Sequence, residues 1–570
     1  MIEFADTLRQ RAWALAHPGG VSAAPLLPRS AREARPTDAT GTPCAEPAWW
    51  QSHSGIAVAT VLLIVIISAA PFIVGYALAP PGMAFTGALT YPQDDAQHEA
   101  WALEMATHLW YTNVLTPEPT PRGWFVSPVE LLLGIAQRIT GIAYPVLRNL
   151  LGVICAPALA FALMTLARRA GLARPGLAAV LALLVGTWAP VVQLAGKIGP
   201  SALARIQTEL GADATPLYQA SQGPGLYVLL SALVLVALSG ANTGDTSRGF
   251  RWAGVAMFAA LAVYPFFGPA LGLTAGLCAL LWARQQGWRA TVEAVVWLGA
   301  WAALPAAYWL GLPRIDPEFA YFEAINRTPL FSPGAVVLNF GLASGALFGL
   351  PRLLRGNRTQ QVLACFTIAV IVALFTPAHP WRSHLYYLSP VLVIAAFAAW
   401  WPLVAHLRPV WRWLIVAALL PVSLGGNPYY YGRYINALMS ARPPAFLAEG
   451  DLAAVRWLGQ QTDNGVVLAP AYVSPWVAAR GDHHVLIGHA LWTHQYARRL
   501  EAVLQVFDAG ADPTPLLHEE NVAWILIAGE APAPVWAEGV EPAARFGVTS
   551  VLQVDALLQH LTTEGPQHGE

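Results

Sequence analysis

The sequence predicts an α-helical polytopic membrane protein with about eleven spans, followed by a small C-terminal α/β soluble domain. Its 570 residues are 56% hydrophobic and only 11% charged, whereas soluble proteins carry about 25% charged residues. A protein so poor in charge lacks the polar groups that cover a water-exposed surface, so lipid must surround much of it. The arginines fall in alternate connections between apolar segments, and only the last quarter of the chain has the composition of a soluble domain.

Residues 1–50 are predicted to form a disordered cytoplasmic tail. They contain no early apolar run, so we expect no cleavable signal peptide. Residues 18–48 are rich in proline, alanine and threonine, a composition that buries too little apolar surface to offset the entropy of ordering. The net charge of −1 gives the chain no general attraction for nucleic acid, so no nucleic-acid partner is expected.

Residues 51–430 are predicted to form the transmembrane domain. A spanning helix needs about 17–25 apolar residues. Apolar segments of about this length lie near residues 54–79, 145–167, 175–195, 222–240, 252–267, 268–283, 292–312, 333–351, 360–376, 384–405 and 411–426. Two short segments meet between Tyr264–Pro265 and Gly268–Pro269, and they could be two spans or one re-entrant feature.

The distribution of arginine predicts the orientation of these spans. Five short connections are basic and nearly free of acids, and they hold Arg168, Arg169 and Arg174; Arg248 and Arg251; Arg284 and Arg289; Arg352, Arg355 and Arg358; and Arg408 and Arg412. The positive-inside rule places these connections and the N-terminus on the cytoplasmic side. The protein is expected in the inner (plasma) membrane. Because the number of spans is then odd, residues 431–570 are expected to form an extracytoplasmic domain.

The opposite connections are longer and contain acids, histidines and aromatic residues. The first outer loop, residues 80–144, holds two amphipathic stretches, Asp95–Trp110 and Pro128–Ile139. In the C-terminal region, strands alternate with helices, which predicts a small α/β layer. The strands are expected at Gly465–Ala469, Val485–Gly488 and Ala523–Ala528, and a helix is expected at His494–Phe507.

The first outer loop contains an acidic cluster where an extended segment enters a helix. Asp95, His98 and Glu99 share one face of that helix because they are three and four residues apart. They could hold a divalent cation, Mg or Mn, or a carboxylate could act as a general base on an acceptor hydroxyl. Asp94 and Gln97 also have the spacing of a capping box, which by itself explains an acid at this position. Both roles can hold, with Asp94 capping the helix and Asp95 pointing into a cleft.

These features together resemble the GT-C glycosyltransferase superfamily, and in particular a loosely defined bacterial group of GT-C-like membrane proteins. The landmarks, in their order along the chain, are Asp94–Asp95, Thr116–Pro119, Ser127–Gly134, Tyr264–Pro265, and Val485–His489 followed by Thr493 and Arg498–Arg499. Relatives often have histidine before the proline of the fourth landmark, where this chain has tyrosine. The resemblance covers most of residues 55–530.

The resemblance implies a GT-C-like transmembrane domain and inverting transfer of a sugar from a polyprenyl-phosphate donor to an acceptor on the outer face. In it an acidic residue activates the acceptor or holds a metal on the donor phosphate. Asp95 is the first candidate for this role and Asp94 the second. A lipid phosphate needs a cation nearby, and the candidates are Arg382 first, then Arg122 and Lys197.

Each of these roles has a simpler alternative. Arg382 suits the anchoring of a helix end at the lipid head groups. His489, which the resemblance suggests as a substrate contact, could be an ordinary surface histidine. A transporter or lipid-handling protein is disfavoured, because few ionisable residues lie within the spans and no internal repeat is visible. A non-catalytic scaffold with the same architecture stays open.

Overall fold

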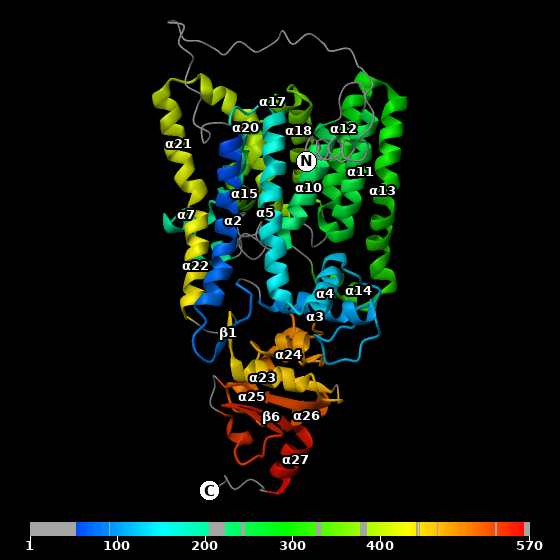
Figure 1. Cartoon of the computed structure of the whole chain (residues 1–570), viewed down its shortest axis with the longest axis vertical. Helices are drawn as coiled ribbons and strands as arrows, with labels where there is room; N and C mark the ends of the chain where they lie inside the picture. Colours follow the sequence, from blue (N-terminus) through cyan, green and yellow to red (C-terminus); the bar gives the residue numbers. More distant parts are fainter. Residues whose placement is uncertain are drawn as a thin grey trace, which may run out of the picture. The chain divides into compact units, whose positions relative to one another are not determined.

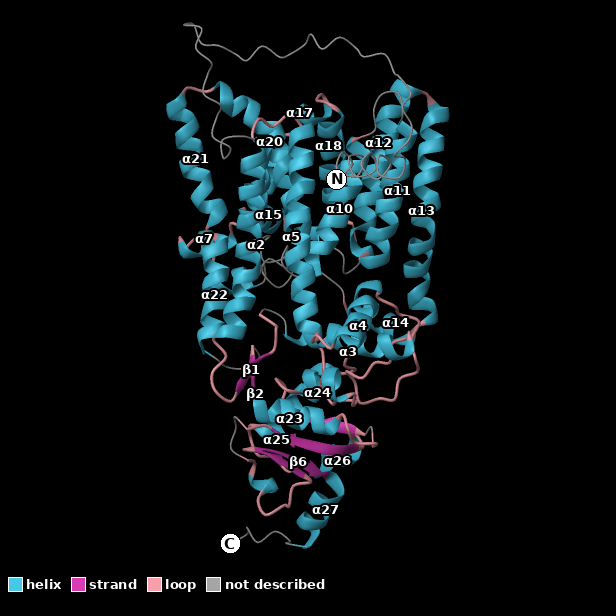
Figure 2. Cartoon of the chain, viewed as in Figure 1, coloured by secondary structure: helices cyan, strands magenta, loops and turns pink. Residues whose placement is uncertain are grey.

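The computed structural model describes residues 53–89, 92–204, 223–240, 246–326, 332–376, 385–440, 443, 445–463, 465–529 and 533–563. The chain is mostly helical, and most of its strands belong to its C-terminal part (Figure 1, Figure 2). The predicted tail at residues 1–50 lies outside the described residues, and so does Arg382.

Seven helices within the described part of the chain are long and apolar enough to cross a membrane. They correspond to Ala57–Ala77 of α2 (His53–Ala77), α5 (Tyr144–Arg169), η2 with α12 (Pro265–Ala283), α13 (Trp288–Ile315), α18 (Arg358–Phe375), η4 (Leu385–Leu388) with α20 (Ser389–His406), and α21 (Pro409–Leu424) with α22 (Gly426–Ser440). This finding indicates a membrane protein. It does not confirm the predicted count of eleven spans.

The other predicted segments form helices that are not among these seven candidate spans. They are α6 (Pro175–Leu184) and α7 (Ala189–Leu194), α10 (Gly223–Ser239), α11 (Thr246–Val263), and α15 (Pro333–Phe340) with η3 (Gly341–Ser344) and α16 (Gly345–Phe348). Residues 175–195, expected as one segment, divide because Val185 is extended and Pro190 starts a new turn. A proline is favoured in the first turn of a helix, where its missing N–H has no partner to lose.

The junction near Tyr264 joins two separate helices. α11 ends at Val263, Tyr264 is extended with φ −150°, and the 3-10 turn η2 (Pro265–Phe267) leads into α12 (Gly268–Gln286). The extended conformation follows from the proline, whose ring disfavours the helical conformation at the preceding residue. The Tyr264 ring stacks on Tyr227 of α10, with centroids 4.1 Å apart.

The first outer loop folds as a small helical layer. It contains β1 (Met83–Phe85), α3 (Pro92–His108) and α4 (Pro128–Thr140). α3 and α4 pack closely, because a Cβ atom on Gly134 would lie 2.0 Å from the carbonyl oxygen of Ala102. Both predicted amphipathic stretches are therefore helices, and they cover each other.

The C-terminal region contains a four-stranded sheet of order β3-β4-β6-β5. Its elements are α23 (Glu449–Leu458), β3 (Val466–Leu468), α24 (Ser474–Gly481), α25 (Tyr496–Phe507), α26 (Thr514–Glu519), β4 (Val522–Ile527), β5 (Ala544–Phe546), β6 (Thr549–Gln553) and α27 (Val554–Thr563). β3 pairs parallel with β4, and the other pairs are antiparallel. The strand expected at Val485–Gly488 is reduced to one bridge, between Val485 and Val467.

The first outer loop and the C-terminal region are held together by strand pairing and by side-chain packing. β1 pairs antiparallel with β2 (Phe446–Ala448), in the register Ala84 to Leu447. Trp101 of α3 packs edge-on against Trp492, with ring centroids 5.3 Å apart. Loop and C-terminal region therefore lie at the same end of the helices, the end of α3, α4 and α14 (Pro317–Ile325) in Figure 1.

Candidate functional site

The candidate site is the first turn of α3, at the level where α5 begins. Pro92 occupies the first turn, and Asp94 and Asp95 follow within it, where the helix dipole favours negative charge. Asp94 thus lies inside the helix, and its described hydrogen bond goes to another part of the chain and not to Gln97. The capping-box alternative is not the arrangement in the structure.

Asp94 forms a hydrogen bond with His489 of the C-terminal region. The Nε2 atom of His489 lies 2.7 Å from Oδ1 of Asp94. On the other side of the ring, Nδ1 lies 3.1 Å from the backbone N–H of Leu491. Because Nδ1 accepts a hydrogen bond from this N–H group, the proton of the neutral ring is on Nε2, which donates a hydrogen bond to the carboxylate of Asp94. His489 is buried, whereas the Asp94 side chain is 49% exposed and is therefore accessible from solvent.

The charge state of Asp94 follows from these contacts. Burial alone would raise its pKa. The hydrogen bond from His489 and the charges of His98 and Arg148 outweigh burial and hold the pKa of Asp94 below its usual value. Asp94 is therefore ionised at neutral pH, as a proton acceptor must be.

Asp95 points to a different partner, Arg148 in the second turn of α5. The two side chains form an ion pair, and they are only 13% and 15% exposed. Burial raises the pKa of Asp95, and the charge of Arg148 opposes this effect. Among the described residues, Arg148 bonds to Asp95 alone and through one nitrogen, so other N–H groups of its guanidinium stay available.

The three predicted metal ligands do not converge. Asp95 pairs with Arg148, and His98 Nδ1 lies 2.9 Å from Glu130 of α4. Glu99 is buried and accepts two 2.9 Å hydrogen bonds from Arg480 of α24. Within the described ranges no group of three or more His, Cys, Asp or Glu side chains could hold a metal. The shared helix face was a correct expectation, but each side chain on it meets a separate element.

The predicted phosphate-binding cations are not brought to the acidic pair by any described contact. Arg122 is exposed in the connection from α3 to α4, where its charge acts on Glu104. Lys197 is exposed just after α7. The cation beside the acidic pair is Arg148, which sequence reasoning missed. Its signal was present, because a lone arginine near the start of an apolar span is unusual and needs a partner.

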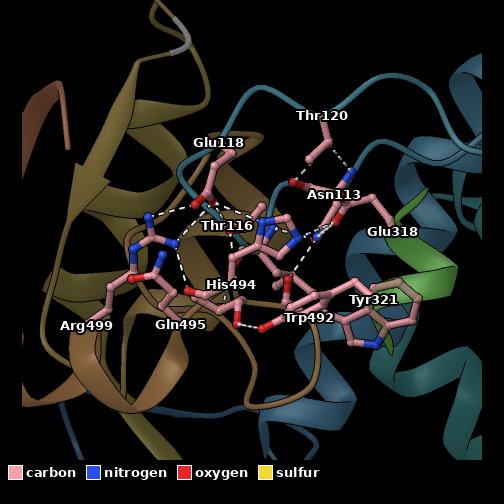
Figure 3. Close-up of polar contacts among 12 residues, drawn as sticks. Asn113, Thr116, Glu118, Thr120, Glu318, Tyr321, Trp492, His494, Gln495 and Arg499 are labelled. Atoms are coloured by element: carbon pink, nitrogen blue, oxygen red, sulfur yellow. Dashed lines mark hydrogen bonds and ion pairs between the residues drawn. The ribbon is translucent and has the colours of Figure 1, made fainter. Parts of the chain in front are cut away.

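A second polar cluster fastens the first outer loop to the C-terminal region (Figure 3). Arg499 of α25 lies 2.8 Å from both Glu118 of the loop and Glu520 of the C-terminal region. His494 lies 3.2 Å from Glu318 of α14, and its ring contacts the ring of Tyr321 of the same helix in a tilted arrangement, with centroids 4.3 Å apart. The segment that carries His489 is therefore held from two sides.

Close backbone contacts fix the same segment. The backbone N–H of Val485 donates to the carbonyl of Val114 at 3.1 Å. The hydroxyl of Thr493 accepts from the N–H groups of Gly488 and His489. A Cβ atom on Gly488 would lie 2.8 Å from Cα of Leu115, so this approach requires glycine. The backbone position of His489 is thus fixed, and its ring is held by the contacts with Asp94 and the N–H of Leu491.

No protein-family model matches the chain, and no curated protein matches it in sequence. Solved structures do resemble it. The apo oligosaccharyltransferase of Archaeoglobus fulgidus superimposes with a TM-score of 0.50 and 13% identity, over 84% of this chain and 70% of that one. The arabinofuranosyltransferase AftD of Mycobacteria gives 0.48 and 15%, over 84% and 37%. ArnT of Cupriavidus metallidurans bound to undecaprenyl phosphate gives 0.45 and 16%, over 86% and 97%.

At these identities the likeness concerns the fold. The match to the oligosaccharyltransferase extends over most of both chains, and it agrees with the resemblance that the order of the sequence landmarks suggests. The chain has the fold of the GT-C-like membrane glycosyltransferases.

Proposed function

We propose that this protein is a membrane glycosyltransferase that transfers a sugar from a polyprenyl-phosphate donor to an acceptor hydroxyl at the outer membrane face. The observation that carries the proposal is the division of roles in the first turn of α3. Asp94 is half exposed and hydrogen-bonded by His489, while Asp95 is buried against Arg148. A base and a cation beside each other are what transfer from a phosphate-linked sugar requires.

Asp94 is proposed as the general base. It takes the proton of the acceptor hydroxyl while the acceptor oxygen forms a bond to the anomeric carbon of the donor sugar. The bond from that carbon to the phosphate oxygen breaks, and its electron pair leaves with the lipid phosphate. Attack opposite the leaving group inverts the anomeric centre. Exposure favours Asp94 over Asp95 for this step, because the acceptor must reach the carboxylate.

Arg148 is proposed to bind the donor phosphate. A guanidinium has five N–H donors and matches phosphate geometry, and only one nitrogen of Arg148 is used by Asp95. Asp95 then acts as a positioning residue that holds Arg148 at the start of α5. The lipid part of the donor would reach this level through the membrane, since Arg148 belongs to a membrane helix.

No step in this scheme needs a metal. The residues first considered as ligands for Mg or Mn each lie beside a different partner: Asp95 beside Arg148, His98 beside Glu130 and Glu99 beside Arg480. A guanidinium paired with a carboxylate repels a second cation at the same oxygens, so Asp95 and Glu99 are poor additional ligands for a metal ion. The remaining candidate cations, Arg382, Arg122 and Lys197, keep a proposed role in drawing the donor toward the site. The proposed setting is the inner membrane, with the N-terminus cytoplasmic and the C-terminal region outside.

The test is a transfer assay on the purified full-length protein with a panel of polyprenyl-phosphate sugars. Removing a general base typically lowers the rate by about 10²–10⁴-fold, so we expect Asp94→Asn to lose that much and Arg148→Gln to lose donor binding. Asp508→Asn is the matched control, because Asp508 is exposed at the end of α25.

Full activity in Asp94→Asn would remove the proposed base. A wild-type protein that transfers no sugar from the panel but binds the lipids would favour the alternative, a lipid-handling protein, transporter or non-catalytic scaffold.

A further inference from the structure

A cavity lies at the end of the membrane helices opposite to Asp94 and Asp95. This cavity of about 430 Å³ opens between α6, α20 and α21, lined by Arg174, Leu177, Leu181, Phe397, Trp401 and Arg412 among others. Its volume falls in the range of about 300–1,000 Å³ that is typical of small-molecule sites. We propose that it binds an anionic phospholipid, with the phosphate between the two arginines and an acyl chain along the apolar wall.

The arginines supply the charge that such a head group needs. Arg174 immediately precedes α6, and Arg412 lies in the first turn of α21. Neither forms an ion pair with a residue that the structure describes, and no acid is among the described residues lining the cavity. Both helices begin here, at Pro175 and Pro409, so their dipoles add positive potential at the same place.

The apolar walls of the cavity would contact the acyl chain of the phospholipid. Most lining side chains are apolar, and Trp401 and Trp413 on its rim are 43% and 72% exposed. Exposed tryptophans of this kind mark the level of lipid head groups. A free phosphate would use only the arginines, whereas a phospholipid uses the arginines and the walls. Basic pockets between membrane helices on the cytoplasmic side bind anionic head groups, and the sequence predicts that this end of the helices is the cytoplasmic one.

This site is separate from the acidic one. Arg148 and Arg169 lie near opposite ends of α5, and at a rise of 1.5 Å per residue they are about 30 Å apart along the helix axis. The cavity lies just beyond the far end of that helix, among the basic connections. The inference therefore stands whether or not the proposed glycosyltransferase function holds.

The test is native mass spectrometry of the delipidated full-length protein, titrated in separate arms with phosphatidylglycerol, phosphatidylcholine and inorganic phosphate. Each arginine near a head group contributes about fivefold in affinity, so Arg174→Gln with Arg412→Gln should weaken phosphatidylglycerol binding about 30-fold. The matched control is Arg352→Gln with Arg355→Gln, which removes two exposed arginines from the same end outside the cavity.

Leu177→Trp provides an independent variant, because it fills the cavity and leaves both arginines in place. It should weaken binding of phosphatidylglycerol without changing its preference over phosphatidylcholine. Equal affinity for the two lipids, or an unchanged affinity in the double arginine variant, would overturn the proposal. Inorganic phosphate that competes fully with the lipid at equal concentration would also overturn it, in favour of a simple anion site.

Discussion

Replacing Arg480 with leucine should leave the Glu99 carboxylate buried without a partner. Glu99 is only 4% exposed, and both of its oxygens accept from Arg480 at 2.9 Å. Removing one member of a buried pair costs about 3–5 kcal/mol. The Arg480 side chain is 21% exposed, so water can reach the vacated space, and we expect the lower end, about 3 kcal/mol. The loss should appear in the free energy of unfolding measured by denaturant titration in mixed micelles.

The chain offers a matched control for this experiment. Arg251 also pairs with a glutamate, Glu293 at 3.3 Å, and also lies over a tryptophan ring, but both side chains are about half exposed. Exposed pairs contribute about 0–1 kcal/mol, so Arg251→Leu should change stability little. A second Glu99→Gln substitution should recover part of the loss in Arg480→Leu. Equal effects of Arg480→Leu and Arg251→Leu would refute the view that α24 holds the acidic helix through this pair.

Three further outcomes are expected. Burial and the nearby charge of Asp482 raise the pKa of Glu104 to about 7 in the folded protein, whereas in the unfolded chain this carboxyl has its usual pKa of 4.5. The free energy of unfolding should therefore fall as the pH rises from about 4.5 to 7, and then level off. Glu104→Gln should abolish that fall in unfolding titrations. In His489→Ala, Asp94 loses the hydrogen bond that lowers its pKa, so the acid limb of the pH–rate profile should move to higher pH; an unmoved limb would exclude this influence. Gly134→Val should cost about 1–3 kcal/mol because of the carbonyl 2.0 Å from its Cβ position, whereas Gly276→Val, with open space around it, should cost less in the same thermal unfolding assay.

Several local features could be read from the sequence because their causes are local. The helix at the acidic cluster, the helix at Tyr496–Phe507 and the break at Pro265 all follow from charge, periodicity or proline within a few residues. Within the described residues, each predicted apolar segment contains helix, although only seven helices are long and apolar enough to span a membrane. Their lengths were less predictable, because extended Val185 followed by Pro190 divides segment 175–195, and Gly341, with φ +52°, divides segment 333–351.

The partners of Asp95, His98 and Glu99 could not be predicted from the local sequence. Asp95 with His98 and Glu99 has the spacing of a shared site, yet each side chain turns to a different element. The choice depends on which arginines the fold brings near. Arg480 is 381 residues from Glu99 along the chain, and no local pattern encodes that approach.

The sequence by itself determined that this chain belongs in a membrane, that five of its short connections are basic, and that Asp94 and Asp95 lie in the first turn of a helix in the first outer loop. These properties depend on composition, on hydrophobic runs and on neighbours within one helical turn. Only the tertiary structure decided that Asp94 meets His489 and Asp95 meets Arg148, which separates a half-exposed carboxylate from a buried one neutralised by arginine. Burial and long-range charge set that distinction, and both exist only once distant segments have packed together.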